Sequence, residues 1–275
     1  MSNAIGGDDH TVAQAASGPA IARPAPLVRE LKRNDLWDAL ILGWRDFKRA
    51  PQYGLFFGML YAAGGWSIVL LATVSGLYYL AYPLAAGFAI VAPFICAGLY
   101  EVSRRLERGD DVSWSDVFGA IRNGGKRDLG WMALVTTFTF FIWMDISIFL
   151  YAMFFGMKAP SPWALIVEIA TTQHGLVFLA VGNLVGACIA FFVFSITVVS
   201  FPMLLDRDVD FVTAMVTSVR VVRRNLSRML VWAVMIGLQI AFILLSGLAA
   251  MLFVLPWLGH ATWHVYRRAV APEAP

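Results

Sequence analysis

Apolar residues fill five long stretches of the chain, and short charged segments separate them. The stretches are residues 53–74, 77–100, 129–155, 176–205 and 229–266. A transmembrane helix needs about 20 mostly apolar residues. The last stretch is about twice that length, so we expect it to fold back as two short spans with a turn near Ser246 and Gly247. The pattern predicts an all-α membrane protein with six transmembrane helices.

Three shorter segments between these stretches are amphipathic and resemble one another. In each segment, four matching positions are apolar and two are cations. Adding 77 or 175 to the residue numbers of the first segment gives the matching positions in the second and the third. The first set is Trp37, Leu40, Ile41, Trp44, Arg45 and Arg49. This spacing places the apolar side chains on one stripe of a helix and the cations near its C-terminal end. We therefore expect helices at residues 35–49, 113–123 and 209–225 along the cytoplasmic surface of the membrane.

Each amphipathic segment is followed by a hydrophobic hairpin, which predicts three repeated modules, at about residues 34–108, 109–206 and 207–270. The membrane domain would therefore cover residues 34–270. Residues 1–33 are rich in Ala, Pro, Gly and Ser and are expected to be a disordered cytoplasmic tail. Residues 271–275 form a second short tail. An apolar run at 163–170, in the outer loop, predicts a short helix on the outer surface.

Composition and charge agree with this interpretation. Charged residues make up 14% of the chain, whereas soluble domains carry about 25%. Mean hydropathy is +0.70. In the six-span arrangement with the N-terminus inside, Lys158 is the one Lys or Arg of 21 that falls outside the cytoplasmic segments. Because cytoplasmic loops carry the excess of cations, both termini are predicted to be cytoplasmic.

Three segments resemble a bacterial family of predicted integral membrane proteins, domain-of-unknown-function family 2189. They are residues 37–49, the sequence Phe-Pro-Met-Leu-Leu-Asp at 201–206, and the closing stretch at 255–267. The resemblance would extend from about residue 30 to residue 270. It implies a multi-pass protein of the bacterial inner membrane, and it implies no particular chemistry.

Asp145 is the ionisable residue deepest in a predicted span. A carboxylate inside a membrane is costly, so it suggests a function in proton, ion or ligand handling. Asn183 is expected at comparable depth on the next span and could hydrogen-bond to it. The alternative is a structural Asp that joins two helices. In either case we expect Asp145 to face the bundle interior.

His260 and His264 lie four residues apart on the last span and therefore share a face. This spacing suits two ligands of one metal ion or a haem. The residues around them offer no third ligand. With Trp257, Trp263 and Tyr266 nearby, an aromatic belt at the membrane interface is the preferred interpretation.

Basic residues follow each amphipathic segment, and they could bind anionic lipid head groups or simply orient the protein. Arg45, Arg122 and Arg220 hold the same offset in the three modules, so they could converge on one phosphate site. The sequence contains no nucleophile–base pair or phosphate-binding glycine loop of diagnostic spacing. We expect no enzymatic activity, no cofactor and no nucleic-acid partner.

The favoured function is a non-enzymatic bundle that organises lipid or a protein partner at the cytoplasmic interface. The alternatives are a small-solute or ion transporter using Asp145, and an intramembrane metal or haem protein using His260 and His264. Small residues recur every four positions at residues 54–62 and 182–190. This spacing favours close packing between helices of the same chain, and the alternative is a face that binds a second copy of the protein.

Overall fold

The computed structural model describes residues 26–123, 126–156 and 161–272, and these segments are helical apart from turns and one β-bridge. The long helices are α2 (Pro51–Val74), α3 (Ala81–Arg108), α5 (Lys126–Phe155), α7 (Gln173–Thr197), α10 (Leu226–Leu245) and α11 (Met251–Ala269). The short helices are α1 (Asp35–Arg49), α4 (Trp114–Asn123), α6 (Pro162–Thr171), α8 (Ser200–Asp206) and α9 (Phe211–Arg224). A 3₁₀ turn, η1 (Tyr78–Leu80), precedes α3.

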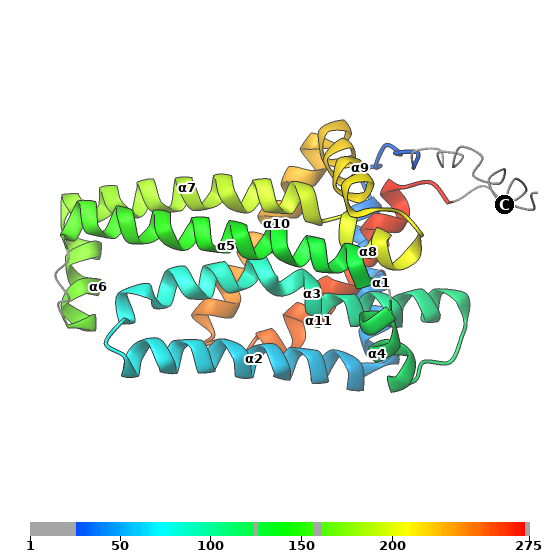
Figure 1. The fold of residues 1–275 in the computed structure, drawn as a ribbon, viewed down its shortest axis with the longest axis horizontal. Coiled ribbons are helices and arrows are strands. Elements are labelled where there is room, and N and C mark those ends of the chain that lie inside the picture. Colours follow the sequence, from blue (N-terminus) through cyan, green and yellow to red (C-terminus); the bar gives the residue numbers. More distant parts are fainter. Residues whose placement is uncertain (1–25, 124–125, 157–160, 273–275) are drawn as a thin grey trace, which may run out of the picture.

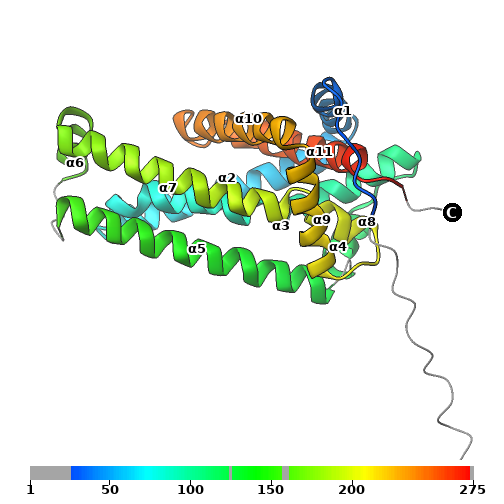
Figure 2. The same ribbon diagram turned by 90° about the horizontal axis from the view of Figure 1, so that it is seen from above.

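Helices α2, α3, α5 and α7 run side by side along the length of the molecule, and α10 slants behind them (Figure 1). Helices α2, α3, α5 and α7 form its main body, and α10 lies on the opposite side of the molecule from α5 (Figure 2). The predicted turn between the last two apolar halves is confirmed, because Gly247 and Leu248 have positive φ angles there. These left-handed residues reverse the chain between α10 and α11.

In the part of the chain that the structure describes, four helical segments are long and apolar enough to cross a membrane. They are α2, residues 128–155 of α5, the run from α7 through α8 at residues 173–206, and α10. Helices α3 and α11 run alongside them (Figure 1) and end in basic turns. The count of six spans therefore remains a prediction.

The amphipathic segments form α1, α4 and α9, and all three lie at the end of the molecule where α11 finishes (Figure 1). Each helix exposes two apolar side chains at matching offsets and turns the intervening one inward. The exposed ones are Trp37, Ile41, Trp114, Phe118, Val212 and Val216. The inward ones are Leu40, Val117 and Met215.

Capping residues fix where two of these helices begin. The Ser113 hydroxyl accepts a hydrogen bond from the backbone N–H of Asp116, and Asp210 accepts one from the N–H of Thr213. Such caps satisfy N–H groups that have no partner within the helix. The outer-loop helix is also present, as α6, and Ser161 caps it.

The prediction of a disordered tail is wrong for residues 26–33, which form an ordered N-terminal strap. Val28 pairs with Val270 in an antiparallel bridge, and the Leu31 side chain is buried. The carboxamide of Asn225 accepts from the N–H of Leu31 and donates to the carbonyl of Arg29. Composition could not show this because Asn225 lies about 195 residues from the strap in the sequence and Val270 lies even farther away. Residues 1–25 lie outside the described residues.

The last turns of α11 form the centre of the core at the strap end. Trp263, Tyr266 and His260 are fully buried there. Helix α11 packs against α1, α2 and α3, which cover it on several sides. The predicted aromatic belt at the membrane surface is therefore wrong for Trp263 and Tyr266, because the tertiary contacts make them core residues.

Candidate functional site

The two histidines of α11 join different helices to it. The Nε2 atom of His264 lies 2.7 Å from the Asp46 carboxylate of α1. The Nδ1 atom of His260 lies 2.8 Å from the Ser103 hydroxyl of α3. All four side chains are buried. Among the described residues no group of three or more His, Cys, Asp or Glu side chains could hold a metal ion, so the arrangement does not support one shared metal site.

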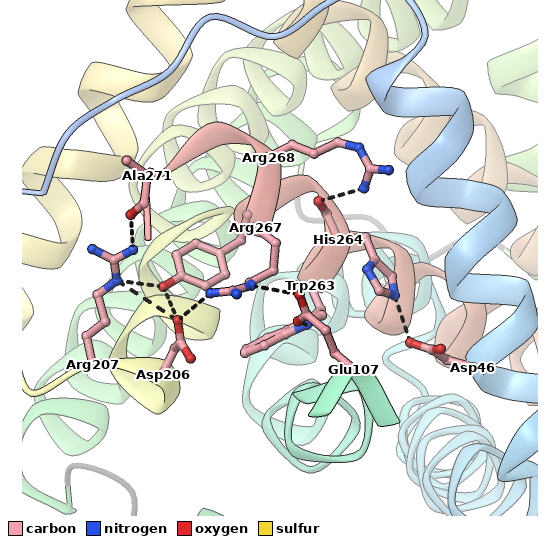
Figure 3. A network of polar contacts seen from close by, with 10 residues as sticks. Asp46, Glu107, Asp206, Arg207, Trp263, His264, Arg267, Arg268 and Ala271 are labelled. Atoms are coloured by element: carbon pink, nitrogen blue, oxygen red, sulfur yellow. Dashed lines mark hydrogen bonds and ion pairs between the residues drawn. The ribbon is translucent and has the colours of Figure 1, made fainter. Parts of the chain in front are cut away.

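A larger polar network surrounds the end of α11 and includes charges that sequence reasoning missed (Figure 3). The Tyr266 hydroxyl donates to Asp206 at 2.6 Å and accepts from Arg207 at 3.0 Å. Arg207 also donates to the carbonyl of Ala271. Asp206 and Arg207 end α8, so this network ties α8 to the last turn of α11 and to the C-terminal segment.

The same network continues to α3 through Glu107. The Trp263 indole N–H donates to one Glu107 oxygen at 3.0 Å, and Arg267 donates to the other at 3.2 Å (Figure 3). Arg267 also lies 3.3 Å from Asp206. Each charge therefore has an opposite partner, as a partly buried ionic cluster requires. The arrangement is that of a structural clamp between α3, α8 and α11.

Other cations at this end are neutralised as well. Arg104 and Arg105 both bind Glu101, at 2.7 and 2.8 Å. Arg105 also pairs with Asp116 at 3.0 Å, and Arg268 pairs with Asp35 at 3.6 Å. These contacts hold α1, α3, α4 and α11 together, so these arginines are mainly structural. The sequence shows the cations but not which of them are paired.

Arg45, Arg122 and Arg220 are all exposed, in contrast to the paired arginines. They lie on α1, α4 and α9, and α4 and α9 occupy opposite edges of this end of the molecule (Figure 1). Among the described residues no hydrogen bond or ion pair joins the three, so their convergence on one pocket stays a prediction.

The expectation that Asp145 faces the bundle interior is wrong. Asp145 is exposed on α5, among the exposed side chains of Phe141, Ile142 and Phe149. No hydrogen bond between Asp145 and Asn183 is present among the described residues. Helix rotation explains the difference, since Trp143, Met144 and Ser147 take the buried face of α5.

Asn183 instead lines an apolar cavity of about 320 Å³ between α3, α5, α6 and α7. Its side chain donates to the carbonyl of Leu179 at 2.8 Å. The walls include Trp143, Phe178 and Ile169, so the cavity has few polar groups. Asp145 does not line it. Asp145 and Asn183 therefore lie at separate places, Asp145 on the exposed face of α5 and Asn183 in the cavity wall.

A comparison with protein families supports the resemblance noted in the sequence. The family described as predicted integral membrane protein (DUF2189) matches residues 81–206. This range runs from α3 to α8 and includes the 201–206 segment, but not residues 37–49 or 255–267. No curated protein and no solved structure gives a significant match.

Proposed function

Because residues 81–206 belong to the family of predicted integral membrane proteins (DUF2189), we propose that this protein is a lipid-organising bundle of the bacterial inner membrane. It would act without catalysis, by holding anionic lipid, or a membrane partner, at its cytoplasmic end. Three modules would each contribute one amphipathic helix and one transmembrane hairpin, giving six spans and cytoplasmic termini.

One observation carries the proposal: α1, α4 and α9 each expose apolar side chains beside an exposed arginine at one end of the bundle. The apolar pairs, such as Trp37 and Ile41, would enter the boundary between head groups and acyl chains. Arg45, Arg122 and Arg220 would then lie at the level of the lipid phosphates. A soluble protein would leave these apolar faces in water at a cost in free energy.

The structure gives less support to the alternatives. A transporter using Asp145 would place that side chain on a polar path through the bundle, yet it lies on the outer surface of α5. A haem or metal protein would need a set of ligands around the histidines; the Nε2 atom of His260 has no hydrogen-bond partner, but among the described residues no group of three or more His, Cys, Asp or Glu side chains could hold a metal ion. Each of these histidines has a packing role instead.

The test is lipid retention by the purified full chain, measured by native mass spectrometry with added cardiolipin. The variant carries Arg45→Gln, Arg122→Gln and Arg220→Gln together. Since one cation near an anionic surface is worth about 1 kcal/mol, we expect binding weaker by on the order of 100-fold. The matched control replaces the same residues with Lys, which keeps the charge. Retention that is equal in the Gln variant and the wild type would contradict the proposal.

A further inference from the structure

We propose that the junction between α9 and α10, together with residues 29–33 of the N-terminal strap, is a binding site for the head group of one anionic phospholipid. The inference rests on the proposed function, because it assumes that this end of the bundle faces the cytoplasmic leaflet. It goes further by assigning a specific site, built from two segments that are far apart in the sequence.

Asn225 assembles the site. It lies between the last residue of α9 and the first residue of α10, and its side chain is 4% exposed. Its carboxamide bonds the strap at Leu31 and Arg29, with distances of 2.7 and 3.0 Å, and also donates to the carbonyl of Val221 at 3.1 Å. A buried amide with several good hydrogen bonds holds both segments in one geometry. The strap is therefore fixed against the junction.

This geometry gathers cations that have no acidic partner. The cations within three residues along the chain of Asn225, or of its strap partners Arg29 and Leu31, are Arg29, Lys32, Arg33, Arg223, Arg224 and Arg228. Within the described part of the chain, no ion pair or side-chain hydrogen bond engages any of them, in contrast to Arg104, Arg105 and Arg267. Glu30 is the acid of the same strap segment. The local excess of positive charge calls for an anionic partner.

The adjoining surface of α10 shows why a lipid fits better than a free phosphate. Beyond Ser227, an exposed apolar stripe runs down α10 with helical spacing. Its members are Leu230, Val231, Val234 and Leu238. Because α10 is one of the segments able to cross a membrane, the stripe would lie among acyl chains. The cations at the α9–α10 junction would match the head group of a phospholipid, and the apolar stripe on α10 would match its acyl chains.

Guanidinium groups suit this ligand because they present planar pairs of donors to phosphate oxygens. The cluster contains five arginines and one lysine. Since each is exposed or half-buried, a head group can reach it without rearrangement of the core. Cations on separate segments would also make lipid binding depend on the strap being in place.

The experiment compares three variants of the full chain in detergent, each with three cations changed to Gln. The junction variant carries Arg223→Gln, Arg224→Gln and Arg228→Gln, and the strap variant carries Arg29→Gln, Lys32→Gln and Arg33→Gln. The matched control changes Lys48 and Arg49 of α1 and Arg108 of α3, which are also exposed and have no assigned lipid contact. Binding of phosphatidylglycerol and of phosphatidylcholine is measured by native mass spectrometry.

We expect the junction and strap variants to bind phosphatidylglycerol on the order of 100-fold more weakly than wild type, and the control variant to lose far less. Binding of phosphatidylcholine by each of the three variants should equal that of wild type. Equal losses in the three variants would overturn this site and leave the proposed function standing. No loss in any variant would overturn both. Displacement of the lipid by millimolar inorganic phosphate would also overturn the lipid assignment.

Discussion

At the scale of single residues, the pairing of Asp46 with His264 is the contact that connects α1 to the centre of the bundle. Both side chains are buried, and no sequence pattern links positions 218 residues apart. In this environment a lost partner leaves a polar atom without a hydrogen bond. Such a loss costs more than the intact bond contributes to stability.

We therefore expect Asp46→Leu to lower the free energy of unfolding by about 1–3 kcal/mol, because it leaves the imidazole of His264 unsatisfied. The measurement is thermal unfolding of the detergent-solubilised protein. The control is Asp38→Asn on the same helix, whose partner Arg268 lies 3.9 Å away at a more exposed position. An exposed pair of this kind contributes little, so the control should match wild type. A similar melting temperature for Asp46→Leu would show that the pair does not support the fold.

At the scale of elements, close backbone contact fixes α1 against α11. A Cβ atom built on Gly43 would lie 2.5 Å from the backbone nitrogen of Ala261. The small residues of α2 behave in the same way, since a Cβ atom built on Gly58 would lie 2.7 Å from the carbonyl oxygen of Leu252. The four-residue spacing on α2 thus serves packing within the chain, as small residues do between membrane helices.

Gly43→Ala is expected to destabilise the protein by about 1–3 kcal/mol, because α1 must move away from α11 to admit the methyl group. Gly182→Ala on α7 is the matched control, since no atom lies within 4 Å of its added Cβ. Helix propensity favours Ala over Gly, so the control should be neutral or stabilising. Melting curves of the two variants check the prediction. Equal stability of the two would mean that the α1–α11 contact is looser than described.

The capping of helix α9 by Asp210 can be tested through the pH dependence of the protein's stability. Hydrogen bonds from the side chain and backbone of Thr213 lower the pKa of Asp210. A lowered pKa in the folded state means that the cap contributes fully above the ordinary Asp pKa of about 3.9 and is lost as the pH falls below it.

Asp210→Ala should cost about 1 kcal/mol at neutral pH, whereas Asp210→Asn should retain most of the cap. Unfolding measured from pH 7 down to pH 3 should show a smaller acid-induced loss of stability in the Asn variant than in wild type. If the two curves fall in parallel, then Asp210 is not a source of the acid sensitivity.

At the scale of the whole molecule, the arrangement across the membrane is the main open prediction. Four segments satisfy the length and composition of a span, and the distribution of cations favours six. An arrangement with four spans and one with six differ in whether α3 and α11 cross the membrane and return the chain to the cytoplasmic side. This difference decides whether α1, α4 and α9 meet one leaflet.

Reporter fusions at Asp110, after α3, and after Pro275 should both behave as cytoplasmic, because six spans place them on that side. A fusion at Ser75, between α2 and α3, should behave as periplasmic and serves as the control. A periplasmic signal at Asp110 would show that α3 does not cross. A periplasmic signal at Pro275 alone would limit the failure to α11.

Much of the fold follows from the sequence because it depends on local periodicity. The helix at 35–49 has the predicted bounds, and α4 and α9 differ from their predicted bounds by one or two residues. The turn at Ser246 and Gly247 and the outer helix α6 also follow from local patterns. A helical period of 3.6 residues and the length of an apolar run are readable without knowledge of any neighbour.

The candidate site depended on contacts that only the tertiary structure decided. The rotation of α5 placed Asp145 outside, and the packing around α11 made Trp263 and Tyr266 core residues. Asn225 joined the strap to the α9–α10 junction, two segments about 195 residues apart in the sequence that both carry cations. The physical reason is that hydrophobicity determines that a segment enters a membrane or a core. Which face of it turns inward, and which charges become paired, depends on side-chain packing between helices distant in sequence.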